Sequence, residues 1–144
     1  MAKRRSRQPA TLTKTQAQFV ALERVCRVAT AGAGGRPHLV PVCHAVAGGK
    51  VYFASGDNGR KVKNVRENPF VTVTCDVYSD HWATLKGVMI QGRARLIERG
   101  PRFARIRKLL YRKYAQYPRD AAISPSDSVI VEVTPVRVFA WGFD

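Results

Sequence analysis

Short apolar runs separated by glycine-rich turns constrain the fold of this chain more than any other feature of its sequence. The run VCRVATAG begins at Val25, and the turn GGRP leads into a second run, HLVPVCHAV. Two apolar runs joined by such a turn predict a β-hairpin. The turn AGGK then leads into a third run, VYFAS. We therefore expect antiparallel strands in the first part of the chain.

The second part of the chain continues this strand pattern. Valine, isoleucine, threonine and aromatic residues are frequent over residues 70–78, 88–97, 129–133 and 136–143. These residue types fit the half-buried surface of a sheet. Together with the earlier runs, they predict roughly six or seven strands.

Three helices are expected between or before these strands. Thr13 and Gln16 have the spacing of a capping box, which predicts a short helix that begins there. Residues 60–67 can form about two helical turns before an Asn-Pro stop signal. Residues 101–117 place apolar side chains on one helical face and cations on the other. Short consecutive strands with few helices favour an antiparallel barrel over an alternating parallel sheet.

The length and charge of the chain limit its possible organisation and partners. A chain of 144 residues has the usual size of one domain, and we expect one domain over residues 13–144 after a basic flexible tail, residues 1–12. No apolar run approaches the roughly 18 residues of a membrane span, and no secretory signal follows the basic start. We therefore expect a soluble cytoplasmic protein. The net charge of +15 favours anionic partners, such as nucleic acid or a phosphorylated small molecule.

Residue spacing predicts neither a metal site nor a catalytic side chain. The three cysteines are odd in number and include no close pair, so we interpret them as buried reduced thiols. The three histidines lack a recognised metal-ligand spacing, so we interpret them as packing or hydrogen-bonding residues. These six residues are Cys26, Cys43, Cys75, His38, His44 and His81.

The stretch GDNGRKVKNVRENP is the best candidate for a ligand site. Ser55 ends a strand, a tight turn follows, and Arg60 and Lys61 open a helix. The free N–H groups and the positive dipole at a helix start favour an anion, so a phosphate group would fit here. A charged first turn on a solvated helix is the alternative interpretation.

The order of several motifs resembles the pyridoxamine 5′-phosphate oxidase-like split-barrel family of flavin and deazaflavin proteins. The motifs are GRPHLVPVCHAV, GKVYFASGDNGRKVKNVRENPFVTV, GVMIQGRARLIE and the final RVFAWGFD. The resemblance covers the chain from about Phe19 onward. It implies a six-stranded antiparallel split β-barrel with a few flanking helices, which forms a homodimer with two cofactor sites at the interface.

The resemblance also implies which residues bind the cofactor. His38, Val40 and Val42 match the strand along the flavin ring, in the same motif as Arg36 and Pro41. The family's phosphate-binding positions match Ser55, Arg60 and Lys61, while Gln91 and Gly92 match positions near the ring. Trp141 is expected to pack over the ring from the partner subunit. The cofactor performs the redox chemistry in this family, so no side-chain nucleophile is expected.

Two departures from the family pattern bear on the substrate. Gly87 occupies a position where the family's B6 oxidases have glutamine, and the chain stops at Asp144 without their basic C-terminal extension. We therefore expect a small reductase that transfers hydride to or from a small organic substrate, rather than a vitamin B6 oxidase. FMN is the expected cofactor, and the deazaflavin coenzyme F-420 with its polyanionic tail is the alternative.

Two functions of other classes stay open. The segment KRRSR and the arginine-rich helix can contact nucleic acid phosphates. Tyr52, Phe53 and Phe70 alternate like core residues rather than like base-stacking residues, so nucleic acid binding is not expected as the main function. The other possibility is a non-catalytic cofactor or haem carrier on the same barrel, with His38 or His44 as the candidate ligand.

Overall fold

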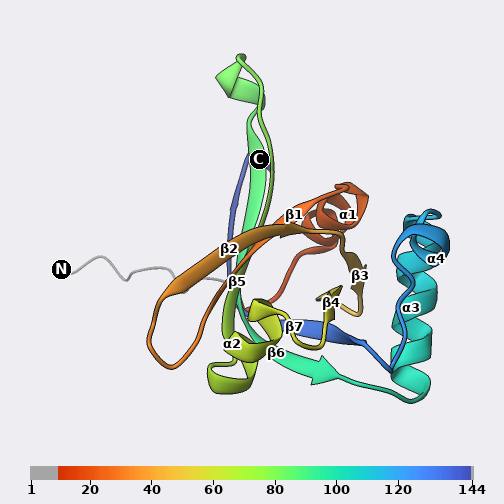
Figure 1. Ribbon diagram of the computed structural model, residues 1–144. Helices are drawn as coiled ribbons and strands as arrows, with labels where there is room; N and C mark the ends of the chain where they lie inside the picture. The colour runs from red at the N-terminus through yellow and green to blue at the C-terminus, as the bar shows by residue number, and fades with distance from the viewer. Residues whose placement is uncertain (1–9, 144) are drawn as a thin grey trace.

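Seven antiparallel strands form one sheet in the computed structural model, which describes residues 10–143 (Figure 1). The strands are β1 (Cys26–Ala31), β2 (Pro37–Val42), β3 (Ala45–Ala47), β4 (Lys50–Gly56), β5 (Phe70–Val77), β6 (Lys86–Ile97) and β7 (Ser128–Trp141). Their order in the sheet is β2-β1-β5-β6-β7-β4-β3. The predicted antiparallel, mainly β architecture is confirmed and is consistent with a split barrel.

The number of strands is seven rather than the six implied by the resemblance. The run HLVPVCHAV was predicted as one strand, but it divides at Cys43 and His44 into β2 and β3. β2 pairs with β1, whereas β3 pairs with β4 at the other end of the sheet. At the break, the buried His44 ring turns inward, and its Nε2 lies 2.6 Å from the carbonyl oxygen of Val20. The short β3 is therefore the additional strand.

The end of the chain forms one long strand where two were predicted. β7 has 14 residues and lies between β4 and β6. The register shifts where Gln91 pairs with Arg137 and Gly92 pairs with Pro135, which leaves Val136 as an extra residue. Such a β-bulge bends a strand locally without ending it and redirects a side chain. The strand therefore continues past Pro135, and the Val136 side chain is exposed.

Within residues 10–143 the sheet is accompanied by four α-helices: α1 (Lys14–Leu22), α2 (Arg60–Glu67), α3 (Pro101–Lys113) and α4 (Tyr117–Asp120). The predicted capping box is confirmed, because Gln16 N–H donates to the Thr13 hydroxyl and Thr13 N–H donates to the Gln16 side chain. The predicted helix over residues 101–117 ends earlier, at Lys113. Tyr114 leaves the helical conformation as the C-cap, and Pro118 has no N–H with which to continue the same helix. A separate short α4 follows.

Two apolar cores lie on opposite sides of β4 and β7. Phe53 and Val131 belong to the main core, whereas their neighbours Tyr52 and Ile130 face the second core, under α3. Glu132 is buried in this second region and accepts a 2.9 Å hydrogen bond from the Tyr52 hydroxyl. These alternating side chains attach α3 to the outer face of the sheet.

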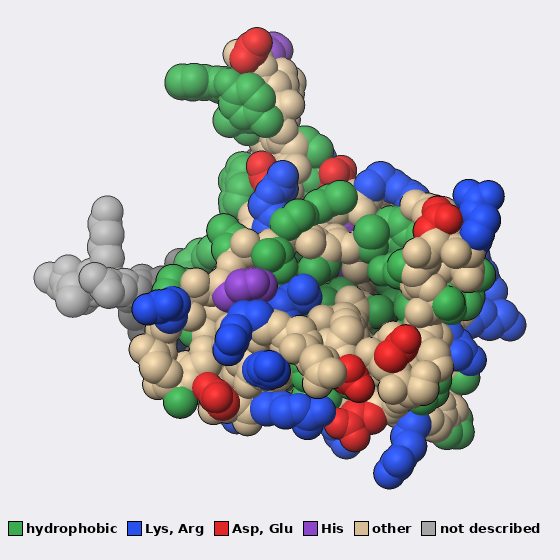
Figure 2. Space-filling model, in the orientation of Figure 1, with side chains coloured by type: hydrophobic (Ala, Val, Ile, Leu, Met, Phe, Trp, Pro, Cys, Tyr) green, Lys and Arg blue, Asp and Glu red, His purple; other side chains and the backbone are tan. Residues whose placement is uncertain are grey.

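The hairpin of β5 and β6 projects from the body as an arm (Figure 1). A single 3₁₀ turn, η1 (Trp82–Thr84), forms its tip. The side chains of Tyr78 and Trp82 are 70% and 72% exposed, and Figure 2 shows hydrophobic groups at the end of the arm. Within residues 10–143, no helix is long and apolar enough to cross a membrane.

Most of the predicted N-terminal tail lies outside the described residues. Of residues 1–12, the structure describes only 10–12, and Leu12 packs against the main core.

Candidate functional site

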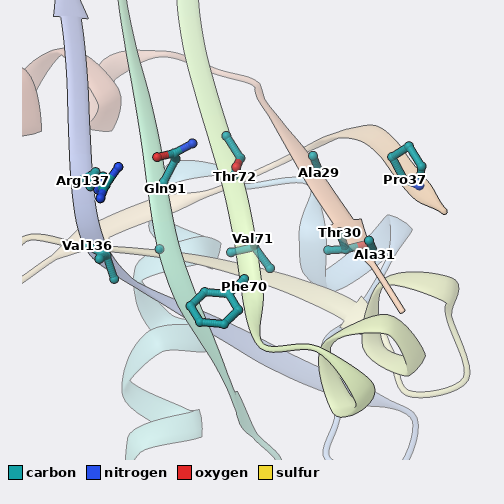
Figure 3. Close-up of a pocket in the computed structure, with 11 residues that line it drawn as sticks. Ala29, Thr30, Ala31, Pro37, Phe70, Val71, Thr72, Gln91, Val136 and Arg137 are labelled. Atoms are coloured by element: carbon teal, nitrogen blue, oxygen red, sulfur yellow. The ribbon is translucent and has the colours of Figure 1, made fainter. Parts of the chain in front are cut away.

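An apolar groove crosses β1, β5, β6 and β7 (Figure 3). It has a volume of about 420 Å³. Phe70 and the bulge residue Val136 contribute exposed apolar side chains to it, and Thr72, Gln91 and Arg137 contribute polar groups. The bulge therefore shapes one wall of a groove that has few polar groups, as binding sites for flat organic molecules commonly do.

A polar pocket of about 360 Å³ lies next to the groove. The loop between β1 and β2 and the start of β2 line it with Arg36 and His38, and α2 lines it with Arg60, Asn64 and Glu67. Pro37 lines both the pocket and the groove, so the two cavities adjoin.

Two hydrogen bonds hold α2 against β1 and the loop that follows it. The side-chain nitrogen of Asn64 donates to the Thr30 hydroxyl at 3.0 Å, and both residues are buried. The Glu67 carboxylate accepts from the backbone N–H of Ala33 at 2.7 Å. A side chain at Gly32 would place its Cβ 2.5 Å from the same carboxylate oxygen and would push the Glu67 side chain aside. The walls of the polar pocket are thus fixed by contacts between distant segments.

Charge and unpaired polar groups make the polar pocket suitable for an anion. Arg36 and Arg60 are exposed, and within residues 10–143 neither forms an ion pair. The buried Nδ1 atom of His38 has no hydrogen-bond partner within the same range. The N-cap of α2 is Gly59, which has no side chain to occupy the free N–H groups of the first turn. Figure 2 shows Lys and Arg side chains gathered over the region of α2 and the β1–β2 loop.

The structure brings together five of the residues that the resemblance implied. They lie in one continuous depression, with Arg36, His38 and Arg60 in the polar pocket and Gln91 and Gly92 in the apolar groove.

The other six implied residues line neither cavity. Val40 and Val42 pack against the main core, and Pro41 lies on the exposed face of β2. Ser55 donates a 3.4 Å hydrogen bond to the carbonyl of Gly56. The remaining two are Lys61, which follows Arg60 on α2, and Trp141, whose ring packs over Gly87 of its own chain. Their assignment to the cofactor stays a prediction.

Sequence reasoning missed several residues that line the site. Asn64 and Glu67 have no local signal, because their partners lie more than thirty residues away. Phe70, Thr72 and Arg137 were assigned to strands without a role at a surface. One signal was available for Val136, since the adjacent Pro135 within a strand indicates a bulge or an edge.

The histidines suggested as haem ligands occupy different environments. His38 lines the polar pocket. His44 is fully buried, hydrogen-bonded to the Val20 carbonyl, and lines neither cavity. Of the two, only His38 is therefore placed to contact a molecule in this site.

Comparisons with known proteins agree with this architecture. The family model described as pyridoxamine 5′-phosphate oxidase matches residues 12–142. None of the curated proteins compared matches the chain.

Three solved structures illustrate the range of similar proteins. Rv2991 from Mycobacterium tuberculosis, a conserved hypothetical protein, is 25% identical with a TM-score of 0.78, over 97% of this chain and 89% of that one. The haem storage protein HutZ from Vibrio cholerae is 15% identical with a TM-score of 0.74, over 90% and 94%. An F420 reductase is 19% identical with a TM-score of 0.70, over 89% and 98%. At these identities, the last two similarities concern the fold alone.

Proposed function

Because this chain belongs to the pyridoxamine 5′-phosphate oxidase family, we propose that it is an oxidoreductase that binds FMN and transfers hydride to or from a small organic substrate. The observation that carries this proposal is the junction at Pro37, where an apolar groove meets a cationic pocket. A flavin ring is flat and largely apolar, and its phosphate is an anion, so the two cavities match the two ends of FMN.

The residues that line the two cavities have the charge and hydrogen-bonding groups that FMN requires. Arg60, the free N–H groups of the first turn of α2 and Arg36 would hold the phosphate through charge-assisted hydrogen bonds. Gln91, Thr72 and Arg137 are polar groups placed to hydrogen-bond a ring in the groove. FMN would supply the hydride transfer when bound, and the chain would bind and orient its ring.

The groove walls are also expected to exclude water. Phe70 and Val136 are 60% and 46% exposed in the single chain, which is unusual for large apolar groups beside a cavity. We propose that a second copy of the chain covers them in a homodimer and encloses the site. This arrangement would also bring the partner's copy of Trp141 to the ring, as the family pattern implies.

The first test is the binding of FMN to the purified protein, followed by absorption and by quenching of flavin fluorescence. The wild type is expected to bind one FMN per chain. Arg60→Ala removes a charged contact worth about 1.5–3 kcal/mol, so FMN affinity should fall on the order of 10–100-fold. The matched control is Lys63→Ala, an exposed position on α2 outside the pocket, which should bind normally.

Three outcomes of this experiment test the proposed function and the residues assigned to the phosphate site. Absence of FMN binding by the wild type contradicts the proposed function. Equal losses in Arg60→Ala and Lys63→Ala would mean that only the overall charge matters. A loss in Lys61→Ala as large as in Arg60→Ala would add Lys61 to the phosphate site, as the family pattern implies.

A deazaflavin reductase is the second candidate, and the two arginines of the polar pocket, which form no ion pair within residues 10–143, favour it. They suit a longer anionic tail as well as a single phosphate, and the F420 reductase shares the fold. Haem storage is the candidate of a different class, because His38 lines the polar pocket and the haem storage protein HutZ shares the fold. Titrations with coenzyme F-420 and with hemin, run beside FMN, distinguish these ligands. A reductase must also oxidise a nicotinamide or deazaflavin donor, which a carrier does not.

A further inference from the structure

Three metal-ligating side chains converge in the main core, away from the groove. Cys26 begins β1, Cys75 lies on β5, and His44 lies between β2 and β3. Their ligand atoms all lie within 4.8 Å of one another. The three residues are 0%, 1% and 0% exposed, respectively, so the cluster is fully buried.

The pairing of β1 and β5 explains why the two cysteines meet. Arg27 pairs with Thr74, and the next residue outward on each strand is a cysteine. Side chains alternate along a strand, so Cys26 and Cys75 face the core while Ala29 and Thr72 face the groove. The cluster and the proposed cofactor site thus lie on opposite faces of the same strands.

The separations match those of a three-coordinate metal site. Bonds of about 2.3 Å to sulfur and about 2.0 Å to nitrogen, at trigonal angles, place the two ligand atoms about 3.7 Å apart. The Cys75 sulfur lies 3.8 Å from the Nε2 atom of His44. This pair therefore needs almost no movement to accept an ion, and the remaining pairs need less than about 1 Å.

We propose that Cys26, His44 and Cys75 form a buried site for a thiophilic d¹⁰ cation, Zn(II) or Cu(I). Two thiolates and an imidazole are soft donors that select these ions over magnesium or calcium, and the cluster contains no carboxylate. Zn(II) would balance the two thiolate charges, and the carbonyl oxygen of Val20, 2.6 Å from Nε2, would have to move outward by about 0.7 Å to become a fourth donor. Cu(I) is satisfied by the three side chains alone.

Binding has a defined proton balance. The two thiol protons leave for solvent, and no electron is transferred. The imidazole proton moves from Nε2, which faces Val20, to Nδ1. Nδ1 is buried without a hydrogen-bond partner within residues 10–143, so the only hydrogen bond lost in this change of tautomer is the one to Val20, and the metal–nitrogen bond must offset the unpaired Nδ1–H donor. Binding should therefore tighten as the pH rises, as for other thiolate sites.

The test measures metal binding by the reduced protein without oxygen. Wild-type protein is titrated separately with Zn²⁺ and with Cu⁺ in competition with a coloured chelator, and native mass spectrometry counts the ions. We expect one ion per chain, and we expect the weaker of the two metals to be displaced by the stronger. Cys26→Ser and Cys75→Ser should each lower the metal affinity by more than about 100-fold. Loss of a residue that only hydrogen-bonds to a metal ligand typically costs about 10–100-fold.

The matched control is Cys43→Ser, which changes a half-buried cysteine next to His44 that lies outside the cluster. This variant should bind like the wild type. Because a serine in the core can prevent folding, X-ray absorption of the loaded wild type provides an independent readout, with two sulfur atoms and one nitrogen expected around the ion. Wild-type protein that takes up neither metal, or whose bound ion lacks sulfur ligands, would overturn the proposal. FMN binding is measured separately, so this result does not depend on the proposed function.

Discussion

The side chain of Asn64 on α2 donates a hydrogen bond of 3.0 Å to the hydroxyl of Thr30 on β1. Thr30 lines the apolar groove and Asn64 lines the polar pocket, so this buried bond forms part of the wall between the two cavities. It therefore couples the position of a helix to the shape of a proposed binding site.

Replacing Asn64 with alanine should weaken both the fold and the site. The buried Thr30 hydroxyl would lose its partner, which costs about 1–3 kcal/mol of unfolding free energy. FMN affinity should fall as well, because α2 carries Arg60. Urea unfolding and FMN titration measure the two effects. Asn58→Ala, in the exposed turn before α2, is the control and should change neither. An unchanged unfolding free energy in Asn64→Ala would mean that the hydrogen bond contributes nothing.

Gly92 should tolerate no side chain. Its Cβ would lie 2.6 Å from the carbonyl oxygen of Thr134, and backbone cannot move aside as a flexible side chain can. Gly92→Ala is expected to destabilise the protein by about 1–3 kcal/mol and to alter the bulge beside it. Gly56→Ala, where no atom lies within 4 Å of the new Cβ, is the matched control. Thermal unfolding compares the two variants, and equal Tm values would contradict the expected crowding.

Arg102 on α3 should stabilise the buried Glu132. Its guanidinium pairs with this carboxylate, and Lys50 lies 3.6 Å from the other carboxylate oxygen. Arg102→Met keeps most of the side chain but leaves the buried charge less compensated, so we expect a loss of about 1–3 kcal/mol. Arg105→Met, an exposed position on the same helix, should cost far less. Chemical denaturation measures the unfolding free energy of both variants. An equal loss in the two would mean that the effect comes from the positive charge of α3 rather than from the contact with Glu132.

Stability should fall in alkaline solution partly through Tyr117. Burial raises the pKa of its phenol to about 12, above the usual value of about 10. Between these values the unfolded chain loses the proton and the folded chain keeps it, so unfolding becomes easier as the pH rises from about 10 to about 12. Tyr117→Phe should show a shallower decline in urea midpoint over this range. Tyr78→Phe, at a position 70% exposed, should follow the wild type. Identical profiles for all three proteins would refute the prediction.

Introducing charge at Val136 should prevent the proposed homodimer. The side chain borders the groove and is 46% exposed in the single chain. Val136→Asp should sediment as a monomer, because an interface would bury the new carboxylate without a partner. Leu22→Asp changes a residue that is 79% exposed on α1, outside the groove, and should leave the dimer intact. If the wild type sediments as a monomer, the proposal that a second copy of the chain covers the groove is wrong.

Local patterns predicted the elements of this fold well. Alternating apolar residues marked the strands, and the capping box at Thr13 and the Asn-Pro signal after Glu67 marked helix ends. The division of one predicted strand into β2 and β3 was not predictable, because it depends on a buried histidine bonded to a residue of α1. The continuity of β7 likewise depends on pairing with β6, which absorbs one extra residue.

From the residues alone, the candidate site was predicted only where its signals are local, whereas Arg36, His38, Gln91 and Gly92 were assigned through the family resemblance. Arg60 follows a turn and opens a helix, and the prediction placed it beside an anion. Asn64 and Glu67 act on residues more than thirty positions earlier, so no window of sequence reveals their role. The same holds for the metal-ligating cluster, because Cys26 and Cys75 meet through the pairing of β1 with β5, and His44 reaches them from the break between β2 and β3.

The position of β7 in the sheet determines when the protein can complete its fold. This strand lies between β4 and β6, yet it is the last of the seven to be synthesised. Until it emerges from the ribosome, facing edges of β4 and β6 have no partner, and both apolar cores lack a wall. Unpaired edges and exposed cores are aggregation-prone. The nascent chain therefore cannot complete its fold before β7 pairs with β4 and β6. Until then it remains prone to aggregation.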